Sequence, residues 1–289
     1  MSDVAANGAD MLLRMDDSKI TKQHWKIMFI SGMGFFTDAY DLFIIGVVMS
    51  ILKDEWHPSA TAVGLVTSTA LLAAAFGAII FGRVADMLGR KRIYGYEVLV
   101  LAAGAIASAF SPDIWWLIGS RIILGIGGDY PVSATLMSEF SGKKSRGMMV
   151  SLVFAMQAAG LIVGPLLAAA FLASGLSKDL VWRLLLAFGA IPALAVFQMR
   201  RHMAESPRYL LATGQHDDAH AAAGRVLGEG QGAARDGKAA KNKAAKKASF
   251  FEGFVALTRR RDLAMRLIGA SAAWFLMDFA CLLYTSRCV

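Results

Sequence analysis

Cysteine is almost absent from this sequence of 289 residues, and histidine is scarce. The two cysteines, Cys281 and Cys288, both lie in the last nine residues, so disulfide bonds cannot organise the fold. The histidines form no cluster with the spacing of metal ligands, so we expect neither a metal site nor a cofactor. All five lie in connections between apolar segments: His24, His57, His202, His216 and His220.

Two further features are missing. The first 26 residues are hydrophilic and hold no apolar core followed by a small-residue cleavage site, so no removable signal peptide is expected. No nucleophilic residue and general base can be recognised as a catalytic pair from their spacing in the sequence, so we do not expect an enzyme.

Apolar residues, in contrast, are abundant. They make up 56% of the chain, and the mean hydropathy is +0.50, which places the sequence in the membrane class. A helix needs about 20 apolar residues to cross a hydrocarbon layer of about 30 Å. The sequence therefore predicts an all-α, polytopic membrane protein with seven spans, near 27–52, 60–82, 93–110, 114–140, 147–173, 182–199 and 266–285.

Basic residues are distributed unevenly between the connections. The connections 83–92 and 141–146 are basic, and the segment 200–266 holds 14 of the 30 Lys and Arg residues. The connections on the opposite side contribute only Lys53 and Lys178. By the positive-inside rule, the N-terminus and the segment 200–266 face the cytoplasm.

These patterns predict four parts. They are a cytoplasmic N-terminus (1–26), a six-helix transmembrane bundle (27–199), a basic cytoplasmic linker loop (200–265) and a seventh transmembrane helix (266–289). Residues 228–249 are rich in Gly, Ala and Lys, which predicts a disordered loop. For its lysine run, attraction to anionic lipid is favoured over binding of nucleic acid.

The seventh span is similar to the first. Alignment of GFFTDAYDL (34–42) with WFLMDFACL (274–282) superposes two phenylalanines and also Asp38 on Asp278. Transporters are often built from such repeats. Because a second half needs further helices, we expect the chain to be truncated after this span, with last residues that are not native; a natural seven-helix protein is the alternative.

Five acids fall at membrane depth: Asp38, Asp41, Glu97, Asp129 and Asp278. An ionised carboxylate costs about 2.5–3.5 kcal/mol at the bilayer centre, so such acids are functional candidates. Asp38 and Asp41 share one helix face, and two carboxylates in one narrow cavity cannot both be ionised cheaply. At least one should hold a proton near neutral pH, as proton-coupled transport requires. Asp41 and Glu97 could instead lie at wet helix ends.

Arg121 is predicted to be the only cation at membrane depth. It is spaced by four from Gly125 and by eight from Asp129, which on one helix places the arginine and the aspartate about 12 Å apart along the axis. Contact with substrate and pairing with carbonyl groups of a neighbouring helix both remain open. For Gln157, binding of an oxyanion and an interhelical hydrogen bond also remain open.

Small residues indicate helix contacts. Ala74, Ala78 and Gly82 follow the small-xxx-small pattern, as do Gly160 and Gly164. This pattern allows close approach of backbones, so we expect these residues to be structural.

Three motifs resemble those of the major facilitator superfamily, in its order: GRVADMLGRKR (82–92), RIILGIGGDY (121–130) and AESPRYL (204–210). GFFTDAYDLF (34–43) and GGDYPVSATLMSE (127–139) look like the proton-coupled inorganic phosphate symporters of fungi and plants. The resemblance implies six helices of an N-terminal bundle and the first helix of a second. It also implies structural or gating roles for Asp86, Arg90, Arg121, Glu139, Arg146, Glu205 and Arg208.

The resemblance also implies a transport site. Phosphate would be held by Tyr130, Gln157, Trp274 and Asp278, and protons would be carried by the first-helix aspartate, which is assigned to Asp38, with Asp129 and Glu97. Asp41, on the same helix face as Asp38, is a further proton-coupling candidate from its position in the apolar run. A tyrosine expected one turn after Asp278 is replaced by Leu282, and contacts from the rest of the second half have no counterpart here.

The function expected is symport of phosphate and protons by alternating access, in the plasma membrane, with lipid contact and no nucleic-acid partner. One alternative is another proton-coupled porter, for sugars, organic anions or glycerophosphodiesters. The other alternative is a phosphate-sensing receptor that signals through the basic loop.

Overall fold

The computed structural model describes residues 2–88, 90–128, 130–201, 203–228, 255 and 258–288. All regular secondary structure in these ranges is helical. The chain divides into two units, Met1–Ala245 and Lys246–Val289, which are described separately.

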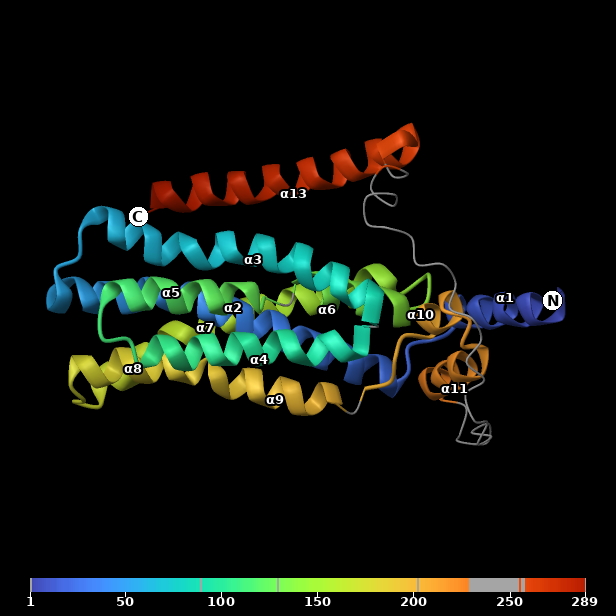
Figure 1. Ribbon diagram of the computed structural model, residues 1–289, viewed down its shortest axis with the longest axis horizontal. Helices are drawn as coiled ribbons and strands as arrows, with labels where there is room; N and C mark the ends of the chain where they lie inside the picture. Colours follow the sequence, from blue (N-terminus) through green and yellow to red (C-terminus); the bar gives the residue numbers. More distant parts are fainter. Residues whose placement is uncertain are drawn as a thin grey trace. The chain divides into compact units, whose positions relative to one another are not determined.

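The first unit contains a bundle whose helices lie along one common direction (Figure 1). They are α2 (Lys22–Trp56), α3 (Ala60–Leu88), α4 (Arg90–Ala109), α5 (Ile114–Ile126), α6 (Tyr130–Phe140), α7 (Arg146–Ala173), α8 (Lys178–Phe188) and α9 (Ala190–Arg201). Helix α2 packs mainly against α7, and α4 packs against both α5 and α9. Two predicted spans are divided, 114–140 into α5 and α6, and 182–199 into α8 and α9.

Three short helices lie together at one end of the bundle (Figure 1): α1 (Ser2–Asp16), α10 (Pro207–Ala212) and α11 (His216–Leu227). The hydroxyl of Ser206 accepts a hydrogen bond from the Tyr209 amide and so caps α10, which begins with a proline. The three helices share a small core that includes Met11, Met15 and Leu210. We call this end of the bundle, which includes the connection 141–146, the basic end.

Glycines allow the bundle helices to approach closely. A Cβ atom added at Gly125 of α5 would collide with the carbonyl of Ala70 in α3, and one at Gly160 of α7 with the carbonyl of Phe36 in α2. Gly160 and its neighbour Gly164 thus confirm the predicted small-residue contact. At Gly82, in the other predicted stripe, no atom of the described residues lies within 4 Å of such a Cβ, so no close contact is seen there.

The outside of the first unit is strongly apolar. Large exposed side chains include Leu71, Leu72, Phe76, Ile79 and Ile80, all on α3. Four helical segments in the described part of the chain are long and apolar enough to cross a membrane: Lys22–Trp56, Ala60–Ala85, Arg146–Ala173 and Lys178–Arg201. Shorter apolar helices cover Gly95–Ala109 and Ile114–Ile126. Such an exterior is what lipid tails require, and water would disfavour it.

The second unit contains α13 (Arg261–Cys288), which covers the seventh predicted span. Most of the predicted disordered loop, from residue 229 to 249, lies outside the described residues.

Candidate functional site

Charged side chains are buried inside the bundle of the first unit. Asp38 and Asp41 in α2, Glu97 in α4, Arg121 in α5 and Arg200 in α9 are each at most 3% exposed. A buried charge is costly unless an opposite charge or hydrogen bonds compensate it. The positions of these buried charges therefore indicate the part of the bundle that is a candidate functional site.

Asp41 and Arg121 form the first pair of opposite charges. Both are fully buried, and although they form no direct ion pair, their opposite charges interact at longer range through the apolar interior. Within the part of the chain that the structure describes, neither carboxylate oxygen of Asp41 and no guanidinium nitrogen of Arg121 has a hydrogen-bond partner. Each charge therefore depends on the other, because removal of one leaves the other uncompensated.

The position of Asp41 is set by Gly189, the residue between α8 and α9. A Cβ atom built on Gly189 would lie 2.9 Å from Cγ of Asp41 and 3.0 Å from Oδ2. The carboxylate therefore occupies space that any other residue at position 189 would fill. Directly before Asp41 in the sequence, the Tyr40 hydroxyl donates a 2.8 Å hydrogen bond to the carbonyl of Leu185, one turn before Gly189, and fixes α2 against α8.

Glu97 and Arg200 form the second pair. Nη1 of Arg200 lies 3.5 Å from Oε1 of Glu97, and Nη2 donates a 3.2 Å hydrogen bond to Oγ of Ser133 in α6. All three side chains are buried. Arg200 is therefore a second buried cation beside Arg121, which was not expected from the sequence. Arg200 was missed because it directly follows the sixth apolar run and begins a polar segment.

The predicted helical stripe from Arg121 to Asp129 is also wrong. Helix α5 ends at Ile126, with Gly127 as its C-cap, and α6 begins at Tyr130. A spacing of eight residues on one continuous helix therefore does not apply. A Cβ atom at Gly127 would lie 2.7 Å from the carbonyl oxygen of Glu97, so the α5–α6 junction packs on the turn of α4 that carries this acid.

Of the remaining predicted site residues, some lie among the described residues and others do not. Gln157 is half-buried in α7. Asp129 lies outside the described residues, and the side chains of Asp86, Arg90, Tyr130, Trp274 and Asp278 are outside them too. Trp274 and Asp278 also belong to the second unit, so their predicted role with Tyr130 and Gln157 stays a prediction.

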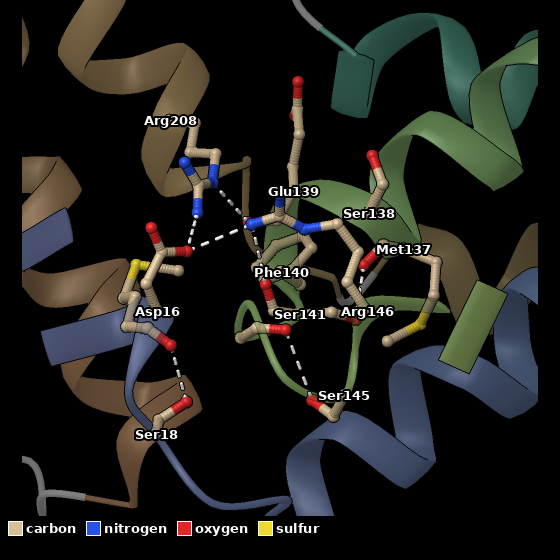
Figure 2. A network of polar contacts seen from close by, with 12 residues as sticks. Asp16, Ser18, Met137, Ser138, Glu139, Phe140, Ser141, Ser145, Arg146 and Arg208 are labelled. Atoms are coloured by element: carbon tan, nitrogen blue, oxygen red, sulfur yellow. Dashed lines mark hydrogen bonds and ion pairs between the residues drawn. The ribbon is translucent and has the colours of Figure 1, made fainter. Parts of the chain in front are cut away.

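A polar cluster lies at the basic end and contains Asp16, Glu139, Arg146 and Arg208 (Figure 2). Oδ1 of Asp16 accepts from Nη2 of Arg146 at 3.0 Å and from Nη2 of Arg208 at 2.6 Å. Nε of Arg208 donates to the backbone carbonyl of Glu139 at 3.1 Å. We call these four residues the Asp16 cluster.

The Asp16 cluster brings together three of the predicted gating residues, Glu139, Arg146 and Arg208. Asp16, the common partner of Arg146 and Arg208, was missed, because it is 130 residues from Arg146 and 192 residues from Arg208 in the sequence. The fourth gating residue of this region, Glu205, is partly buried, and its Oε1 accepts from the Ser206 amide at 3.2 Å. Among the described residues, no group of three His, Cys, Asp or Glu could hold a metal ion.

In a comparison with protein families, residues 22–286 match the family described as "Sugar (and other) transporter". Among curated proteins, the chain is 37% identical to "Inorganic phosphate transporter 1-11" of Oryza sativa subsp. japonica over 92% of its own length and 54% of that protein. It is 35% identical to "Low affinity inorganic phosphate transporter 4" of Medicago truncatula, over 94% of the chain and 58% of that protein. The chain thus spans about half the length of these relatives.

Solved structures show the same fold. The partially occluded inward open conformation of the xylose transporter XylE from E. coli matches with a TM-score of 0.65 at 20% identity, over 72% of this chain and 55% of that chain. XylE bound to 6-bromo-6-deoxy-D-glucose, described as a major facilitator superfamily proton:xylose symporter, matches with a TM-score of 0.62 at 21% identity, over 71% and 50%.

Proposed function

The chain belongs to the "Sugar (and other) transporter" family and has the major facilitator fold of a multi-pass membrane protein, and we propose that it serves proton-coupled symport of inorganic phosphate by alternating access. The chemical identity of the substrate rests on similarity to proteins named inorganic phosphate transporters. The observation that carries the proton coupling is the buried pair of Asp41 and Arg121.

The coupling follows from charge balance at this pair. When a proton binds a carboxylate oxygen of Asp41, an O–H bond forms and the negative charge is lost. Arg121 then becomes a buried cation without compensation, and an incoming anion is attracted to the bundle. Release of the proton on the other side of the membrane restores the negative charge of Asp41, which compensates Arg121 again and lowers the affinity for the anion. Asp38, Asp129 and Glu97 are further candidates for proton transfer.

We propose that phosphate is held by Tyr130, Gln157, Trp274 and Asp278. Neutral donors suit the oxygens of dihydrogen phosphate, and an ionised Asp278 can accept a hydrogen bond from a phosphate hydroxyl. This carboxylate would repel fully deprotonated phosphate, which makes binding selective for the protonated anion.

The proposed organisation is a six-helix bundle (27–199), a linker (200–265) and the first helix of a second bundle (266–289). The basic residues of the linker and of the connection 141–146 favour a cytoplasmic basic end. The plasma membrane is the proposed location, and lipids, phosphate and protons are the proposed partners. No enzymatic step is proposed.

The test is uptake of labelled phosphate into proteoliposomes that contain the full chain. With an acidic exterior, uptake should exceed that without a gradient and should fall when a protonophore is added. Asp41→Asn should remove the dependence on the gradient. Asp54→Asn is the matched control, because Asp54 is in the same helix but is 69% exposed and pairs only with the exposed Lys178 among the described residues.

Three outcomes would contradict the proposal. Phosphate uptake at the same rate with and without a proton gradient would exclude coupling to protons. Stronger competition by xylose, an organic anion or a glycerophosphodiester than by unlabelled phosphate would indicate another substrate. Binding of phosphate without uptake would favour a receptor.

A further inference from the structure

Arg200 is the last but one residue of α9, yet its side chain points into the bundle. It is 2% exposed, whereas the next residue, Arg201, is exposed and lies with Cζ 5.7 Å from the ring centroid of Phe197. Two successive arginines therefore have opposite environments. Their comparison separates the effect of a buried guanidinium from that of positive charge alone.

The guanidinium of Arg200 connects two other helices. One terminal nitrogen is paired with Glu97 of α4, and the other donates to Ser133 of α6. The planar guanidinium presents several donors in fixed directions, so one side chain can hold two groups at once. A lysine at this position could compensate Glu97, but its single ammonium on a flexible stem would not hold both partners in the same geometry.

The α6 partner lies close to the predicted phosphate site. Ser133 is three residues after Tyr130, the first residue of α6, and so is one helical turn away. On the other side of the α5–α6 junction, Gly127 packs on the backbone of Glu97 and Leu101. The start of α6 is therefore positioned against one turn of α4 from two directions, by backbone contact and by Arg200.

We propose that Arg200 is a positioning residue for substrate binding, which fixes the start of α6 against Glu97 of α4. This inference rests on the proposed function, since Tyr130 is a proposed phosphate ligand. Arg200 does not touch phosphate in this proposal. Its charge compensates Glu97, and its hydrogen bond to Ser133 sets the position of the helix that begins with Tyr130.

The test compares four variants for phosphate uptake by the full chain. Ser133→Ala removes the hydroxyl that accepts from Arg200 and leaves the pair of Arg200 with Glu97 in place, and loss of a hydrogen bond to a charged group should raise KM by about tenfold with little change in maximal rate. Arg200→Lys should raise KM similarly. Glu97→Gln combined with Arg200→Gln removes both charges of this pair together, so that neither is left opposite an uncharged partner, yet should retain the high KM. Arg201→Lys is the control and should keep the original KM.

A measurement without phosphate separates this inference from the proposed function. Spin labels at two exposed positions, Tyr96 of α4 and Thr135 of α6, report the distance between these helices after Cys281 and Cys288 are replaced by serine. Ser133→Ala and Arg200→Lys should broaden the distance distribution, and Arg201→Lys should not. Unchanged distances and an unchanged KM in Ser133→Ala would overturn the inference. Absence of phosphate uptake in the unmodified chain, with broadened distances, would overturn only the proposed function.

Discussion

The two buried arginines each face one acid, but their surroundings differ. Arg200 has a hydrogen bond to Ser133 in addition to its ion pair with Glu97. Arg121 has only the electrostatic interaction with Asp41 among the described residues. A pair with additional hydrogen bonds is fixed in place, whereas a pair without them can be broken by one proton at lower cost. This difference is why we assign positioning to Arg200 and proton coupling to Asp41.

Gly189→Ala should disturb Asp41 without changing its chemistry. The alanine backbone fits this position, since φ is −56° and ψ is −30°, but its Cβ would lie 2.9 Å from Cγ of Asp41. We expect gradient-driven phosphate uptake to fall on the order of tenfold, because small displacements of reacting groups are costly. Gly64→Ala is the control, as its Cβ would have no atom within 4 Å. Equal uptake by both variants would contradict the packing of Asp41 against residue 189.

At the scale of elements, the bundle depends on close helix contacts. The clearest is on α5, where two glycines have different surroundings. A Cβ at Gly125 would collide with the backbone of Ala70, whereas one at Gly119 would have no atom within 4 Å. The same substitution on one helix therefore tests tertiary packing separately from helix propensity.

Gly125→Ala should lower the melting temperature of the purified protein in detergent, with a cost of about 1–3 kcal/mol from overpacking. Gly119→Ala should leave it unchanged or raise it, because alanine is favoured over glycine in a helix interior by about 1 kcal/mol. Circular dichroism during heating measures both variants. A melting temperature for Gly125→Ala at or above that of Gly119→Ala would show that α5 and α3 are not packed at this glycine.

The long helices could be predicted from the sequence, because an apolar run that crosses a membrane is visible without knowledge of its neighbours. The all-helical fold is confirmed by similarity to XylE. The short helices α1, α10 and α11 could not be predicted in this way. Their buried residues, such as Met11 and Ala222, are few and separated, and these residues become a core only when the three helices pack together.

The candidate site, like the fold, could be predicted from the sequence only in part. Burial of Asp38, Asp41 and Glu97 follows from the position of each acid inside an apolar run. The partners were not predictable, since Glu97 and Arg200 are 103 residues apart. The break between α5 and α6 was also missed, although the glycine pair Gly127 and Gly128 interrupts the run and could have indicated it.

At the scale of the whole molecule, the two ends of the bundle have different charge. The basic end carries the Asp16 cluster and the connection 141–146. The opposite end holds Arg183, which pairs with Asp179 at 3.0 Å and donates to the Ala109 carbonyl at 3.0 Å. The excess of basic residues at one end is the basis of the proposed orientation.

Labelling of single cysteines in intact cells tests this orientation. Lys144→Cys and Leu176→Cys place a thiol at exposed positions near opposite ends, in a background where Cys281 and Cys288 are serine. A membrane-impermeant maleimide should label position 176 in intact cells, and position 144 only after the cells are permeabilised. The reverse pattern would show that the basic end faces outward.

The Asp16 cluster has a consequence for biosynthesis. Asp16 leaves the ribosome long before Arg208, which follows 192 residues later, or about 10–40 s at usual rates of translation. Met11 and Met15 of α1 are buried in a cluster with Leu210 of α10 and Ala219 of α11, which are synthesised later still. This apolar cluster can therefore form only after the bundle helices α2 to α9 have been synthesised. Docking of α1 is then among the last steps in the folding of this unit.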